Sequence, residues 1–199
     1  MQSDLRNLIF ASSLTLLLTS CTLVDSNPKF SADVIEFRQV LSVSSVQSGV
    51  EAYGQKFKDV DCRTLPSNFE PPIDLIGCSG DEKQVYLLGV SELDGNSIEQ
   101  AKHHRADSSG DQWFIMIDFD DTGTKRFAEF TRRVTTLPAP MNQIAITSDR
   151  LVITSPAIND EISSGSAVIT GSFTMQEALD LSRAIKNRSA IPLYFKWRE

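Results

Sequence analysis

Residues 165–174 have the sequence GSAVITGSFT, and MQEALDLSRAI (175–185) and IPL (191–193) follow them. The alternation of side chains in the first segment is typical of a half-buried strand. Thr174 and Glu177 have the spacing of a helix capping box, and apolar residues recur at helical spacing through the second segment. This part of the chain therefore predicts a strand, a capped helix and an exit strand.

Similar patterns predict the elements that precede this segment. Trp113–Phe119 has the clearest strand alternation, and Asp120 or Asp121 can cap the helix that follows it. The full set of expected elements is strands at Val34–Val43, Val85–Leu88, Trp113–Phe119, Gln143–Ile146 and Arg150–Ile153, and helices at Val50–Lys58, Ser97–His104 and Thr122–Thr136. We therefore expect an α+β fold, with helices packed on a mixed or antiparallel sheet.

The N-terminus has the features of an export signal. Arg6 precedes the apolar run Leu8–Leu18, which is too short to span a bilayer as a mature helix. The run ends in LTSC, with Cys21 where a bacterial lipobox places its lipidated cysteine. We expect a lipoprotein signal peptide over 1–20, a flexible tether over 21–32, and a lipid-anchored protein on the extracytoplasmic face of the plasma membrane. An ordinary secretory signal with a chance cysteine is the alternative.

Cys62 and Cys78 remain once Cys21 is assigned to the lipid. An even pair in an exported domain predicts a disulfide, and the proline- and glycine-rich segment 61–80 between them needs such a restraint. Two buried free thiols are the alternative. A zinc site is less favoured because no second Cys or His pair stands at ligand spacing.

The formal net charge is −7, and no basic stripe stands out in the sequence. Such a chain is a poor match for nucleic acid. It is also a poor match for electrostatic docking on anionic lipid, so we expect the lipid on Cys21 to do the anchoring.

Two motifs raise the question of catalysis or metal binding. Asp118 and Asp120 follow an apolar strand as the two aspartates of haloacid-dehalogenase-like phosphatases do, where one attacks phosphorus and the other handles protons. Downstream, only Asp160-Glu161 offers a second acidic pair, and it does not follow a buried parallel strand. The adjacent His103 and His104 are expected at the solvated end of a helix, where neighbours point too far apart to chelate one ion. We therefore expect neither an enzyme nor a cofactor.

An ordered series of short motifs resembles the first periplasmic domain of SecD, the accessory subunit of the Sec protein-export machinery, and chiefly its head. The motifs are Tyr86-Leu87-Leu88-Gly89, Glu92-Leu93-Asp94-Gly95, Asp121-Thr122-Gly123-Thr124-Lys125, Ser155-Pro156 and Ile169-Thr170-Gly171. The resemblance implies a small base-like region with the disulfide loop over 33–84 and a head over 85–199. Asp149-Arg150 departs from the family's usual Asp-Gly, and Ser189 stands where a Gly often precedes the exit strand.

The resemblance also implies a function. It predicts a head without the membrane helices that couple SecD proteins to protons, which binds exported polypeptide or a component of the Sec translocase. A structural or ligand-binding lipoprotein with no export role is the alternative.

Overall fold

The structure is a computed structural model that describes residues 35–58, 60–65, 70–106 and 112–187. Two short 3₁₀ turns lie at Val46–Ser48 and Gly95–Ser97. The strands are β1 Ile35–Ser45, β2 Val50–Ala52, β3 Gln55–Phe57, β4 Leu75–Ser79, β5 Gln84–Asp94, β6 Ile98–Arg105, β7 Trp113–Phe119, β8 Ile144–Ser148, β9 Leu151–Thr154 and β10 Ser166–Phe173, and the helices are α1 Asp121–Val134 and α2 Met175–Asn187.

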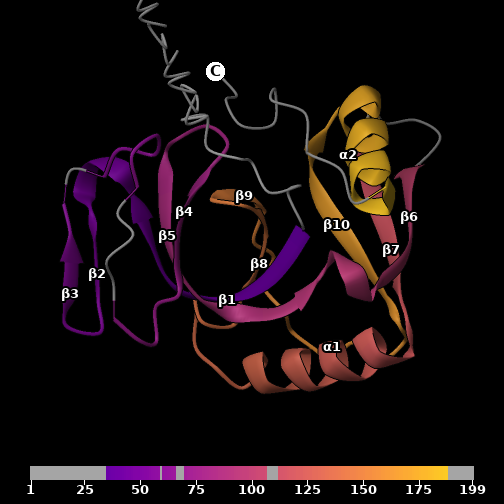
Figure 1. Ribbon diagram of the computed structural model, residues 1–199, viewed down its shortest axis with the longest axis horizontal. Helices are drawn as coiled ribbons and strands as arrows, with labels where there is room; N and C mark the ends of the chain where they lie inside the picture. Colours follow the sequence, from indigo (N-terminus) through magenta and orange to yellow (C-terminus); the bar gives the residue numbers. More distant parts are fainter. Residues whose placement is uncertain (1–34, 59, 66–69, 107–111, 188–199) are drawn as a thin grey trace, which may run out of the picture.

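Five strands close into a barrel in the order β1-β5-β4-β9-β8, and a separate three-stranded sheet has the order β10-β7-β6 (Figure 1). Neighbouring strands are antiparallel except β4 and β9, which run parallel. The β1–β5 pairing shifts register three times between Phe37 and Ser42. Such irregularities bend a strand and increase its twist, which helps the barrel to close.

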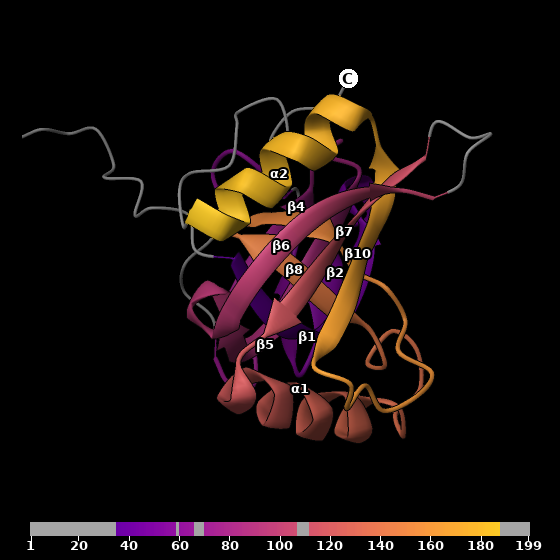
Figure 2. The same cartoon turned by 90° about the vertical axis from the view of Figure 1, so that its right-hand side faces the viewer.

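The largest core cluster lies where the barrel, the three-stranded sheet and both helices meet. Phe37 of β1 packs edge-on against Phe119 of β7 and Phe127 of α1, at ring centroid distances of 5.7 and 5.8 Å. Figure 2 shows α2 running beside β6, and α1 crossing the base of the molecule below the sheet. One apolar core therefore fixes the sheet, the barrel and both helices relative to one another.

The expected α+β class is confirmed, as are most of the expected elements. Asp120 caps α1 through Gly123, and Thr174 and Glu177 form the capping box of α2. The exit strand expected at 191–193 lies outside the described residues. The division into a base over 33–84 and a head over 85–199 stays a prediction, and strands of both segments share the barrel.

Two expected helices are wrong. Residues 50–58 form the β2–β3 hairpin, because Tyr53 and Gly54 both adopt positive φ and make the tight turn that joins two antiparallel strands. Residues 97–104 end a 3₁₀ turn and then form β6, which pairs with β7 along its length. Pairing with a strongly apolar neighbour strand outweighs the weak local helical pattern of this segment.

Candidate functional site

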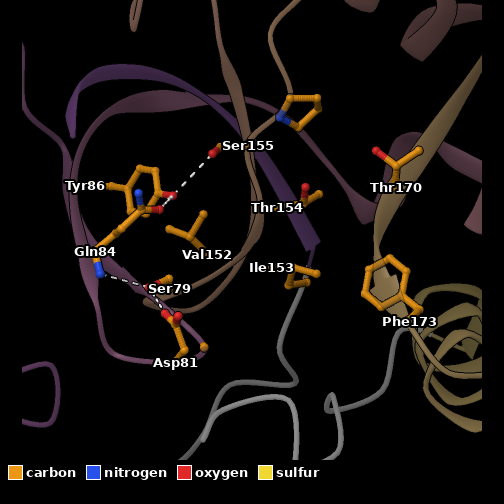
Figure 3. A pocket seen from close by; sticks show the side chains of 12 residues that line it. Ser79, Asp81, Gln84, Tyr86, Val152, Ile153, Thr154, Ser155, Thr170 and Phe173 are labelled. Carbon is orange, nitrogen blue, oxygen red and sulfur yellow. Dashed lines mark hydrogen bonds between the residues drawn. The ribbon is translucent and has the colours of Figure 1, made fainter. Parts of the chain in front are cut away.

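A cleft of about 450 Å³ opens between the rim of the barrel and the three-stranded sheet (Figure 3). Its volume lies within the range of small-ligand sites. It is lined by Ser79, Gly80, Asp81, Gln84, Tyr86, Val152, Ile153, Thr154, Ser155, Pro156, Thr170 and Phe173. The lining comes from the β4–β5 turn, the start of β5, β9 with the residues after it, and the end of β10.

A chain of hydrogen bonds organises the barrel side of the cleft. Ser79 Oγ donates to Asp81 Oδ1 at 2.6 Å and accepts from the backbone N–H of Gln84 at 3.0 Å. The bond from Ser79 and the neighbouring Lys83 hold the pKa of Asp81 below its ordinary value, against a smaller effect of burial. Asp81 is therefore an anion at the rim of the cleft at neutral pH.

Tyr86 lies deeper in the same wall. Its hydroxyl donates to Gln84 Oε1 at 2.6 Å and accepts from Ser155 Oγ at 3.4 Å. Burial raises the pKa of Tyr86 above its ordinary value, and the negative charge of Asp81 adds to this, although the bond from Ser155 opposes it. The Tyr86 hydroxyl thus stays neutral and orders the polar wall.

Strand ends and a strand edge meet at the cleft. The parallel pairing of β9 with β4 ends at Val152 opposite Ser79, and the cleft lies against the next two residues of β9, Ile153 and Thr154. On the opposite side, β10 is an edge strand of its sheet, and it contributes Thr170 and Phe173. Exposed strand edges beside small pockets suit an extended polypeptide, which binds through its backbone.

The two cysteines predicted to pair lie close to this cleft. Cys62 Sγ and Cys78 Sγ are joined at 2.01 Å, and Cys78 is the residue of β4 that precedes Ser79 of the lining. Arg150 attaches the same loop to the β8–β9 turn, because its Nη1 donates to Leu65 O at 2.8 Å. Leu65, three residues after Cys62, is thereby tied to the barrel rim. Cys21 lies outside the described residues.

The two carboxylates of the phosphatase motif have structural partners. Asp120 Oδ1 accepts from the backbone N–H of Gly123, and Asp118 Oδ1 accepts from Ser166 Oγ, each at 2.6 Å. Their strand, β7, lies between two antiparallel neighbours, β6 and β10. The phosphatase mechanism needs parallel strands that deliver a lysine and further acidic residues to the same edge, so the topology argues against it.

His103 and His104 lie on strand β6 rather than at a helix end, so their side chains project to opposite faces of the sheet. The His103 ring lies 5.8 Å from that of Trp113, and its Nδ1 is 3.4 Å from Ser182 Oγ of α2. His104 stacks on Phe114 at 5.5 Å. Within the described ranges, no group of three or more His, Cys, Asp or Glu side chains could hold a metal ion.

Three residues that line the cleft, Tyr86, Ser155 and Thr170, were not expected at a site from the sequence. Tyr86 stands in an apolar strand, where a core position is expected. The hydroxyls of Ser155 and Thr170 belong to segments about fifteen residues apart, so the sequence does not bring them together. The one available signal was the ordered run of family motifs, because all three residues fall within it.

The structure thus defines an α+β domain with a cleft between a barrel and the edge strand of a second sheet. The chain belongs to the family described as SecDF, P1 head subdomain, which matches residues 73–190. This confirms the resemblance found in the sequence.

Similar curated proteins are described as protein translocase subunits. The chain is 30% identical over 130 residues to the protein translocase subunit SecD of Streptomyces coelicolor. The aligned region covers 64% of this chain and 23% of that protein. The chain is 30% identical over 136 residues to SecD of Mycobacterium tuberculosis, covering 66% and 22%. The chain therefore spans about a quarter of the length of these relatives.

Two solved structures share the fold. One, described as a membrane component SecDF that enhances protein export, superposes with a TM-score of 0.51 at 23% identity, covering 81% of this chain and 64% of that one. The other, SecDF in a super-membrane-facing form, superposes with a TM-score of 0.50 at 25% identity, and the match covers 80% of this chain and 19% of that one. Across the described parts of this chain, neither helix is long and apolar enough to cross a membrane.

Proposed function

We propose that this protein is a lipid-anchored SecD-type head that binds an extended segment of an exported polypeptide in the cleft between β9 and β10. The observation that carries the proposal is the position of the cleft, between the end of β9 and an edge strand of a SecD head domain. Family membership supports a role in protein translocation. The particular ligand and the anchor are our inference.

The lining fits an unfolded chain better than a small metabolite. Hydroxyl groups of Thr154, Ser155 and Thr170 offer both donors and acceptors, and Val152 and Phe173 offer apolar contact. A polypeptide backbone has the same mixture of needs at every residue, so the cleft can bind varied sequences. Binding alone requires no covalent chemistry, and we propose no enzymatic activity.

The decisive experiment is photo-crosslinking in cells. A photoreactive amino acid at Thr170, at the mouth of the cleft, should trap secreted polypeptides during export. The same amino acid at Thr136, exposed just after α1, is the matched control and should trap few of them. Recovery of Sec translocase subunits instead would identify the machinery as the partner. Recovery of neither, with normal secretion kinetics in a deletion strain, would favour a lipoprotein without an export role.

The anchor is tested separately. Incorporation of labelled palmitate should be lost in Cys21→Ser and retained in Cys62→Ser. Equal labelling of wild type and Cys21→Ser would contradict the lipid anchor, and it would leave the proposal for the cleft unaffected.

The phosphatase alternative has its own assay. We expect no hydrolysis of a generic phosphate ester with Mg²⁺, because Asp118 and Asp120 are engaged by Ser166 and Gly123. Turnover that disappears in Asp118→Asn would make the protein an enzyme.

A further inference from the structure

Helix α1 turns a basic face to solvent, although the whole chain carries a net charge of −7. Its 14 residues hold four cations against two acidic residues. The cations, all exposed, are Lys125, Arg126, Arg132 and Arg133. Phe127, Phe130 and Val134 on the other side are buried in the main core. The helix is thus fixed through its apolar side, and its basic side is presented outward.

Three of the four cations form no ion pair with a carboxylate of the described residues. Arg133 pairs with the Glu92 carboxylate and lies over the ring of Phe130, 5.2 Å from its centroid. Arg126 donates to the Glu92 backbone oxygen, which leaves its charge uncompensated. Lys125 and Arg132 form no ion pair with any of the described residues. Asp121, four residues before Lys125, and Glu129 are the two acidic residues that α1 places among these side chains.

An exposed apolar segment follows this face directly. Residues 137–141 have the sequence LPAPM, and Pro138 and Ala139 are exposed. The Tyr53 hydroxyl at the β2–β3 turn reaches Met141 Sδ at 3.6 Å, and Tyr53 is 48% exposed. A large aromatic side chain with a polar tip therefore stands beside the apolar segment.

A second cavity, of about 250 Å³, has lining residues that contact both this segment and the basic face. Gln39 lines it and donates from Nε2 to Met141 O at 3.0 Å, and Glu92 lines it and pairs with Arg133. Val90, in the same lining, is 58% exposed. We call the α1 cations, residues 137–141, Tyr53 and Val90 the α1 corner. Figure 1 shows α1 along the underside of the molecule, below the barrel and the three-stranded sheet.

We propose that the α1 corner docks on an anionic phospholipid surface. Cations next to exposed aliphatic residues and a tyrosine are the combination that binds the membrane interface, where headgroups meet the cations and the apolar groups enter the acyl boundary. Glu92 of the connecting cavity pairs with Arg133, and Asp74 shares Arg38 with Glu36, so Lys125, Arg126 and Arg132 are the cations left to meet the headgroups. The docking depends neither on the cleft ligand nor on acylation of Cys21.

The test is co-sedimentation with vesicles of phosphatidylcholine alone or mixed with phosphatidylglycerol. The protein begins at residue 22, which removes Cys21 and the apolar run Leu8–Leu18 but keeps every residue of the core clusters. We expect binding to the mixed vesicles that weakens with salt. The double variant Lys125→Gln with Arg132→Gln should lower the partition coefficient between water and the mixed vesicles about 25-fold, because each cation near the lipid contributes roughly fivefold.

Arg183→Gln with Lys186→Gln on α2 is the matched control, because it makes the same charge change at exposed positions elsewhere. It should leave binding within about twofold of wild type, since charges beyond a Debye length from the lipid contribute little. Tyr53→Ser with Val90→Ser should weaken binding and leave its salt dependence unchanged. Equal losses in the α1 and α2 variants, or no binding to mixed vesicles, would overturn the proposal. Thermal melts of each variant check that it is folded.

Discussion

Asp120 Oδ1 accepts a hydrogen bond of 2.6 Å from the backbone N–H of Gly123, and this bond caps α1. Asp120→Ala removes the cap and should lower the free energy of unfolding by about 1 kcal/mol in urea denaturation. Asp120→Asn keeps a side-chain acceptor and should cost only a few tenths of that. A loss that is equally large in Asp120→Asn would show that the charge, and not the cap, is what matters.

Gly123 in the first turn of α1 is in tight contact with the chain before β6. A Cβ atom at this position would lie 2.8 Å from Ser97 O and 2.9 Å from Ser97 Cβ. Helix propensity predicts that Gly123→Ala gains about 1 kcal/mol, but we expect a net loss of about 1–3 kcal/mol because backbone must move. Thr122→Ala, one residue away and exposed, is the control, and its unfolding midpoint should hardly change.

The disulfide between Cys62 and Cys78 closes a loop with a sequence separation of 16. Cys62→Ser should lower the free energy of unfolding by about 3 kcal/mol, because the unfolded chain regains the freedom that the bond removed. Reductant should weaken the wild type and leave the variant unchanged. Two thiols that alkylate readily before any reductant is added would contradict the pairing.

Tyr86 makes stability depend on pH in the alkaline range. Its folded-state pKa lies above its ordinary value of 10.0, chiefly through burial. The folded protein therefore holds this proton more tightly than the unfolded chain does. This contribution is complete below about pH 10 and is lost as the pH rises towards the raised pKa. Urea denaturation should show that the free energy of unfolding falls above that pH, and that it falls less in Tyr86→Phe. An identical fall in the variant would refute the assignment to Tyr86.

Arg38 holds a buried polar cluster at the irregular β1–β5 pairing. Its Nη1 donates to Asp74 Oδ2 at 2.6 Å and to Gly89 O at 2.9 Å, and only 9% of its side chain is exposed. Arg38→Ala should cost roughly 2–3 kcal/mol, because charge-assisted bonds and buried packing are lost together. Lys56→Ala breaks an exposed pair with Glu51 and should leave the urea midpoint almost unchanged, because solvent screens that pair. Similar costs for both changes would show that burial of Arg38 adds nothing.

The elements that the sequence predicted correctly are those with their own local signals. Trp113–Phe119 alternates over its whole length, and the Asp120 and Thr174 caps stand at fixed distances from the apolar stripes of their helices. These signals are local because a strand face or a helix cap is set by residues a few positions apart. The ordered motifs added the family, which no single element carries.

Tertiary structure decided what depends on residues distant in the chain. The β6 segment became a strand because β7 lies beside it, and Tyr53-Gly54 made a hairpin where a helix was expected. Barrel closure joins β1 to β8, about a hundred residues apart, and the cleft exists only where β9 and β10 face each other. The net charge is a sum over the whole chain, so it does not reveal the basic side of α1. That side is defined by the fold, which buries the apolar side of the same helix. The sequence by itself determined the family and the local elements, and packing decided which surfaces they present to a partner.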